Sequence, residues 1–126
     1  MSNNFLLNDF YKIEEINSSD SKITAKLSLN PDHAIFKGHF EQMPVVPGVC
    51  QTQILKELLQ NNTGKTLLLS KGDNIKFMGM IVPTQNPVVM VEMDYVMVES
   101  NVIKADAKLF FENTTFTKFK GEFEIN

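Results

Sequence analysis

The sequence has no arginine and no tryptophan, a single cysteine, and only two histidines among its 126 residues. Arginine is the side chain best suited to bidentate contacts with phosphates and bases, and the net charge of −3 opposes binding to a polyanion. We therefore expect no nucleic-acid partner. The lone Cys50 excludes an internal disulfide, and no pair of cysteines or histidines has the spacing of a zinc site. We expect no bound metal, and we expect Cys50 to be a small buried apolar residue.

Long apolar segments are also missing. The longest uncharged apolar run is far shorter than the ~20 residues that a membrane-spanning helix needs. The first residues do not combine a basic region with a long apolar stretch, so they do not resemble a signal peptide. Hydrophobic residues make up 43% of the chain, which is enough for a core of its own. We expect one domain over residues 1–126, located in the cytoplasm and without a membrane span.

Apolar and polar residues alternate along much of the chain. Alternation with a period of two is typical of antiparallel strands that have one covered face and one solvent face. The clearest such stretches are residues 21–30, 89–97, 103–111 and 119–125, with two further candidates at 10–16 and 65–80. The last of these is interrupted near residues 71–74, where glycine and polar residues gather.

One stretch, from Gly48 to about Asn62, has the composition of a helix. Strong helix formers fill it, Pro47 precedes it and Gly64 follows it, which suits the start and the stop of a helix. A broad apolar stripe runs along it, formed by Cys50, Ile54, Leu55, Leu58 and Leu59. A single apolar helix among about six antiparallel strands is buried most simply if the sheet curls around it. The pattern thus favours an α+β fold of the hot-dog type.

Residues 33–49, which read HAIFKGHFEQMPVVPGV, differ from the rest of the chain. They contain both histidines together with two prolines and two glycines, and they show little alternation. Glycine permits backbone conformations that other residues resist, whereas proline fixes the path of the chain. Irregular backbone beside the start of a buried helix is a common place for a small binding site.

Within this segment, G-H-F is followed after three residues by P-V-V-P-G-V. This run resembles the signature of the FabZ-type 3-hydroxyacyl-acyl carrier protein dehydratases, which is roughly GHFPxxPxxPGV. The positions that match are Gly38, His39, Phe40, Pro44, Pro47, Gly48 and Val49. The predicted order of strands around the helix is also similar to that family, over nearly the whole chain. The resemblance implies the hot-dog fold and the dehydration of 3-hydroxyacyl thioesters to trans-2-enoyl thioesters, in fatty-acid or polyene-type lipid biosynthesis.

The resemblance also implies roles for individual residues. His39 would be the base that removes the α-proton, because a neutral imidazole can accept a proton near pH 7. The amide of Gly48, with Val49 as a weaker candidate, would receive the thioester oxygen at the positive end of the helix. No cofactor is implied, since the phosphopantetheine arm arrives with the substrate. His33 lies outside the motif, and we expect it to have a structural or surface role.

The chain departs from the family fourteen residues after His39, where a catalytic glutamate is replaced by Gln53. A carboxamide has no titratable proton for the departing hydroxyl. Gln53 could instead orient the hydroxyl or a water while His39 acts as base and then as acid. Glu57, one helical turn further on, or Glu41 could supply a carboxylate, although we expect both to be solvated surface groups. Alternatively, the chain is a hot-dog acyl thioesterase or a non-catalytic partner that binds the acyl carrier.

The resemblance further implies a homodimer or a trimer of dimers, with the site at the dimer interface. In this arrangement His39 of one subunit faces Gln53 of the other. The partner would be an acyl carrier protein that delivers the thioester. A substrate tunnel is predicted between apolar side chains that would look the same in an ordinary core: Phe40, Val45, Val46, Ile54, Phe77 and Met78.

Overall fold

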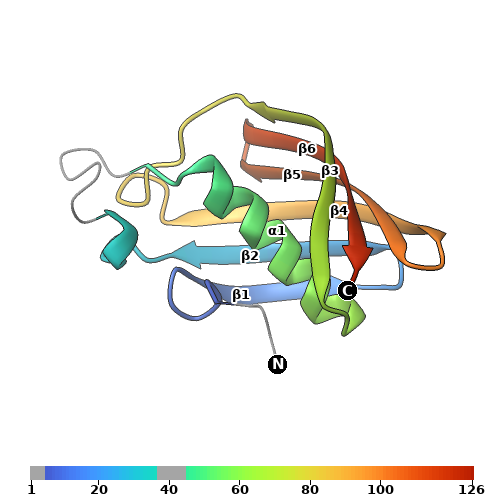
Figure 1. The fold of residues 1–126 in the computed structure, drawn as a ribbon. Coiled ribbons are helices and arrows are strands. Elements are labelled where there is room, and N and C mark those ends of the chain that lie inside the picture. The colour runs from blue at the N-terminus through green and yellow to red at the C-terminus, as the bar shows by residue number, and fades with distance from the viewer. Residues whose placement is uncertain (1–4, 37–44) are drawn as a thin grey trace.

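A computed structural model of the chain describes residues 5–36 and 45–126. It contains one long helix, one short 3-10 helix and six strands, coloured along the chain in Figure 1. In chain order the elements are β1 (Tyr11–Ser18), β2 (Lys22–Leu29), η1 (Ala34–Phe36), α1 (Gly48–Thr63), β3 (Leu67–Phe77), β4 (Val88–Glu99), β5 (Val102–Phe111) and β6 (Thr114–Ile125).

The six strands form one antiparallel sheet in the order β1-β2-β4-β5-β6-β3. The sheet curves, and α1 lies across its inner face (Figure 1). Helix α1 and strand β3 come between β2 and β4 in the chain, yet β2 and β4 are neighbours in the sheet. The predicted arrangement of about six antiparallel strands around one helix is therefore confirmed.

The helix is held by the apolar stripe that its sequence predicts. Cys50, Ile54, Leu55, Leu58 and Leu59 are all buried against the sheet. Complete burial of a side chain such as leucine stabilises the fold by about 1.5–3 kcal/mol. The helix also begins and ends where the sequence predicts. Pro47 precedes the first turn in an extended conformation, and Gly64 closes the last turn in the left-handed region with φ 71°.

Alternation in the strands places one set of side chains under the helix. On β2 the buried residues are Ile23, Ala25, Leu27 and Leu29, and the first three pair across the ladder with buried residues of β4. The pattern stops near the end of β4, where Met97 is half exposed although its alternation predicts the covered face. Two residues earlier, the Tyr95 hydroxyl still accepts a hydrogen bond from Asn62 in the last turn of α1.

Strand β3 is an edge strand and differs from the others. Apart from Leu67 and the half-buried Ile75, its residues are exposed, and these include Leu68, Leu69 and Phe77. Its register against β6 shifts twice, between Leu69 and Lys71 and between Gly72 and Asn74, which is where the sequence predicts an interruption. Opposite this irregular part, β6 carries a glycine. At Gly121 a Cβ atom would lie 2.6 Å from the carbonyl oxygen of Lys71, so the two strands approach too closely for any larger residue.

No helix in the described part of the chain is long and apolar enough to cross a lipid bilayer.

Candidate active site

The predicted site is divided between residues that the structure describes and residues that it does not. Gly38, His39, Phe40 and Glu41 lie outside the described residues, so the role of His39 as base stays a prediction. The second half of the motif, Val45 to Val49, and the whole of α1 are described. The geometry of the site is therefore built from the helix and the segment that leads into it.

Two hydrogen bonds fix the backbone just before the helix. The amide of Val46 donates to the carbonyl of Ile81 at 2.9 Å, and the carbonyl of Val46 accepts from Nε2 of Gln51 at 3.2 Å. Gln51 is buried, and its Oε1 accepts a hydrogen bond from the hydroxyl of Thr117 on β6. The path of the chain into Pro47 and Gly48 is thereby tied both to the helix and to the sheet.

The first turn of α1 presents amides that the helix itself does not use. The amides of Cys50 and Gln51 both return to the carbonyl of Pro47, at 3.0 and 3.1 Å. The amides of Gly48 and Val49 precede these two, at positions where a helix supplies no carbonyl partner of its own. Val49 is 74% exposed, so the Val49 side of this turn faces solvent in the single chain. The predicted placement of Gly48 and Val49 at a helix N-terminus is confirmed, but their contact with a thioester stays a prediction.

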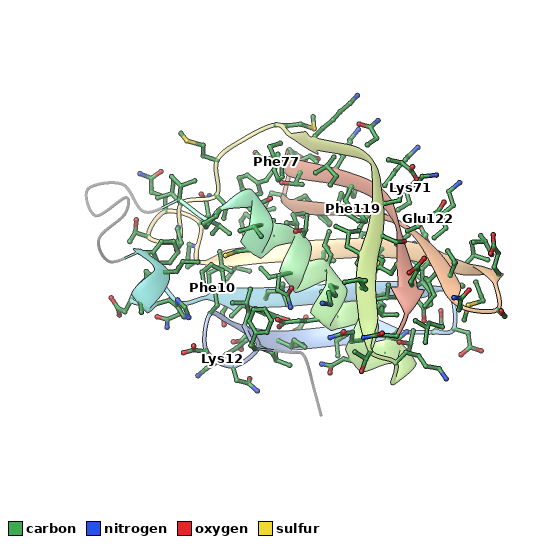
Figure 2. All side chains as sticks on the ribbon, viewed as in Figure 1. Phe10, Lys12, Lys71, Phe77, Phe119 and Glu122 are labelled. Atoms are coloured by element: carbon green, nitrogen blue, oxygen red, sulfur yellow. The ribbon has the colours of Figure 1, made fainter. Side chains whose placement is uncertain are left out.

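The ring of Phe77 covers Gly48. A Cβ atom at position 48 would lie 2.7 Å from Cζ of that ring, which is closer than real contacts allow. Glycine at this position therefore lets an aromatic ring from the end of β3 lie directly against the helix start. Phe77 itself remains 54% exposed, and Figure 2 shows it on the upper side of the molecule near the end of β3.

Gln53 lies one turn beyond this opening and is joined to a second polar residue. Its Nε2 donates to Oε2 of Glu57 at 2.8 Å. The expectation that Glu57 is a solvated surface group is wrong, because its side chain has no exposed area at all. The residues before β1 cover it, and they supply donors that make its burial possible. Glu41, which we also expect to be a solvated surface group, lies outside the described residues.

Three further donors surround the carboxylate of Glu57. The amide of Leu6 bonds to Oε2 at 3.0 Å, the amide of Leu7 to Oε1 at 2.9 Å, and the hydroxyl of Tyr11 to Oε1 at 3.0 Å. Burial raises the pKa of the Tyr11 hydroxyl above its ordinary value, and the charge and hydrogen bond of Glu57 raise it further. Burial, followed by the charge of Glu57, also raises the pKa of the Cys50 thiol, which makes Cys50 a poor nucleophile.

The residues predicted to line a tunnel occupy different environments. Val46 and Ile54 are buried in the core, and Val45 is half-buried. Phe77 and Met78 are more than half exposed, and Phe40 lies outside the described residues. Phe77 does lie beside Gly48, but a tunnel through these side chains stays a prediction.

His33 has the structural role that its position outside the motif predicts. Its Nε2 lies 3.0 Å from Oδ2 of Asp9, and its Nδ1 accepts the amide of Ile35 at 3.0 Å. Its ring also meets the ring of Phe10 edge-on, with centroids 5.2 Å apart. His33 thus connects the start of η1 to the turn before β1.

Sequence reasoning missed Tyr11, Gln51 and Thr117, and it misjudged the environment of Glu57. One signal for Glu57 is present in the sequence. It lies seven residues after Cys50 and three after Ile54, on the same stripe that buries both of them. The amides of Leu6 and Leu7 carry no sequence signal, because any residue other than proline has the same donor.

Known proteins resemble this chain in sequence. The chain is 38% identical over 72 residues to the 3-hydroxyacyl-[acyl-carrier-protein] dehydratase FabZ of Streptococcus mutans, a match that covers 52% of this chain and 51% of that protein. The chain thus spans about half the length of the curated relatives it matches.

Solved structures share the fold at low sequence identity. The dehydratase heterocomplex ApeI:P from Xenorhabdus doucetiae superimposes with a TM-score of 0.70 at 17% identity, covering 89% of this chain and 96% of that one. A hypothetical thioesterase from Streptococcus pneumoniae, solved with coenzyme A, superimposes with a TM-score of 0.64 at 10% identity, covering 92% and 85%. These neighbours establish the hot-dog fold. The family description "ApeI-like: ApeI dehydratase" matches residues 15–117, from β1 into β6. The chain therefore belongs to the ApeI-like family of hot-dog dehydratases.

Proposed function

We propose that the chain dehydrates 3-hydroxyacyl thioesters carried on an acyl carrier protein, giving trans-2-enoyl thioesters. The observation that carries this proposal is the open first turn of α1, where the amides of Gly48 and Val49 stand one turn from Gln53. Membership of a dehydratase family, and the similarity to an enzyme named for this reaction, support the choice of substrate class.

The proposed reaction is an elimination in which His39 takes a proton from C2 of the acyl chain. The electrons of that C–H bond form the C2–C3 double bond, and the C3–O bond breaks. The thioester oxygen gains negative charge as the proton leaves, and the amide of Gly48 stabilises it. One such donor typically contributes about 10²–10³ in rate.

The hydroxyl group needs a proton in order to leave as water. Gln53 has none to give, because a carboxamide does not titrate. The imidazolium of His39, formed in the first half of the reaction, is the acid that we propose. Gln53 then holds the hydroxyl group by a hydrogen bond, so that its oxygen stays within reach of the imidazolium.

The site is proposed to form between two copies of the chain. Strand β3 is an eleven-residue edge strand with apolar side chains exposed at Leu68, Leu69 and Phe77. Long apolar edges of this kind are normally covered by a partner. We propose that β3 of one subunit pairs with β3 of another, with Gln53 of each chain facing the histidine of the other. A different hot-dog subunit is the alternative partner, which the heterocomplex ApeI:P favours.

A second function, hydrolysis of acyl thioesters, is favoured by two observations. Position 53 carries an amide, which can hold an attacking water, and a structural neighbour is described as a hypothetical thioesterase. The two reactions are separated by giving the purified protein a 3-hydroxyacyl thioester of an acyl carrier protein and following enoyl product and free thiol independently. We expect enoyl product without thiol, and we expect its loss in His39→Ala. Thiol release without enoyl product would reject dehydration in favour of hydrolysis.

A further inference from the structure

Glu57 is the most unusual polar residue in the described part of the chain. Its side chain has no exposure to solvent, yet each of its four hydrogen-bond partners is a neutral group: two backbone amides, a phenol and a carboxamide. An ionised carboxylate has about four acceptor sites and no donor, so the four partners match its full capacity. All four groups around the carboxylate of Glu57 donate to it.

The accepting oxygens of Glu57 decide how Gln53 is oriented. A carboxamide has a donor end and an acceptor end, and a carboxylate that only accepts can face the donor end alone. Nε2 of Gln53 lies 2.8 Å from Oε2 of Glu57, the distance of a charge-assisted hydrogen bond. Rotating the amide by half a turn would set two oxygens against each other at that distance. Oε1 of Gln53 is therefore held on the side away from Glu57.

Glu57 is itself held from outside the helix. Leu6 and Leu7 belong to a turn that closes on Tyr11, with the amide of Asn8 bonded to the carbonyl of Tyr11 at 2.7 Å and a φ of 70° at Asn8. The amides of Leu6 and Leu7 and the Tyr11 hydroxyl therefore bring three of the four donors from one compact piece of chain. The carboxylate cannot rotate without breaking several of these bonds together.

We infer that Glu57 is a positioning residue, which holds the Gln53 carboxamide with its oxygen toward the acyl group. Position 53 then acts as a hydrogen-bond acceptor for the 3-hydroxyl group of the substrate. The hydroxyl group donates a hydrogen bond to Oε1 and keeps its proton, which leaves a lone pair of its oxygen open to the acid that protonates it. This inference rests on the proposed dehydration. It explains how that reaction proceeds with an amide at position 53, where the family has an acid. The carboxylate is retained, one turn deeper in the helix, and acts through Gln53.

The first test observes the hydrogen bond without any enzyme assay. In the wild-type protein the side-chain amide of Gln53 should show one proton shifted downfield and slow to exchange with solvent in ¹⁵N-resolved NMR spectra. Glu57→Gln should remove this signature. Tyr11→Phe is the matched control, because it takes one donor from Glu57 but leaves the bond to Gln53. A Gln53 signal that is unchanged in Glu57→Gln would overturn the inference.

The second test uses kinetics on the same proteins. Misplacing a substrate-orienting group by about 1 Å can cost roughly 10² in rate. We expect Glu57→Gln to lower kcat by roughly tenfold to a hundredfold with a smaller change in KM, whereas Tyr11→Phe keeps kcat within about threefold. Equal losses of kcat in the two variants, at equal thermal stability, would mean that Glu57 acts only through the fold and would overturn the inference.

The third test is a pH profile that a purely structural residue could not alter. Gln53→Glu puts a second carboxylate at hydrogen-bond distance from Glu57, so the pair shares a proton and one pKa of the pair rises. The rate should then acquire a new pH-dependent limb, and this limb should move to lower pH in Gln53→Glu/Glu57→Gln, where the neighbouring carboxylate is absent. Identical profiles for the single and double variants would overturn the inference. If the wild-type protein fails to dehydrate while its Gln53 signature is intact, the proposed function is rejected but the hold of Glu57 on Gln53 is supported.

Discussion

Replacing Glu57 with leucine should destabilise the protein far more than the loss of one surface charge. The substitution places an apolar side chain at a fully buried position and removes all four acceptor contacts. The amide of Leu6 and the hydroxyl of Tyr11 would be left in buried surroundings, whereas Leu7 and Gln53 are partly buried and can reach water. An orphaned buried donor costs about 1–3 kcal/mol.

The expected loss in the free energy of unfolding is therefore about 2–6 kcal/mol. For a domain of this size that is a fall of roughly 10–20 °C in Tm. Glu57→Gln keeps the shape and one acceptor oxygen, so that one of the two buried donors stays paired, and its loss should be about half as large. The measurement is urea unfolding followed by circular dichroism, with Tm from calorimetry as a second probe.

Tyr11→Phe provides the control, since it removes one of the orphaned donors. The double variant Tyr11→Phe/Glu57→Leu should lose less stability than the sum of the two single variants, because the phenol is no longer left unpaired. A loss below about 1 kcal/mol in Glu57→Leu, or strict additivity in the cycle, would refute the assignment of a saturated buried carboxylate.

Three further outcomes follow from the same structure. Gly48→Ala should lower kcat/KM by roughly tenfold to a hundredfold with little change in Tm, because the new methyl group displaces the Phe77 ring tip and crowds the amide; an unchanged rate would contradict the role of that amide. Unfolding stability should fall as the pH rises above about 10, since the raised pKa of Tyr11 favours the protonated phenol in the folded state, and Tyr11→Phe should flatten this fall. Leu68→Lys should shift sedimentation toward a smaller species, whereas an unchanged species would exclude pairing through β3.

Most of the fold could be predicted from local sequence patterns. One face is buried in strands β2, β4, β5 and β6 and in helix α1. Burial of one face produces a period of two in a strand and of about 3.6 in a helix, and both periods can be read from the sequence. Strand β3 was predicted as interrupted, and its register shifts fall at that place. The exposure of Met97 could not be predicted, because it departs from the alternation of its own strand.

The site was predictable in its motif but not in its surroundings. The helix start at Gly48 and the position of Gln53 follow from spacing, whereas the burial of Glu57 depends on the amides of Leu6 and Leu7, about fifty residues away in the chain. A glutamate judged alone is usually solvated. Only the tertiary contact with the turn before β1 makes this carboxylate a buried one.

The most direct test of the proposed chemistry is to follow the atoms of the substrate. A 3-hydroxyacyl thioester of an acyl carrier protein, deuterated at both C2 positions, is incubated with the protein, and the product is measured by intact mass spectrometry. Dehydration predicts an enoyl thioester still attached to its carrier, with water and one deuteron lost. A free acid that keeps both deuterons and the hydroxyl group, together with a bare carrier thiol, would contradict it.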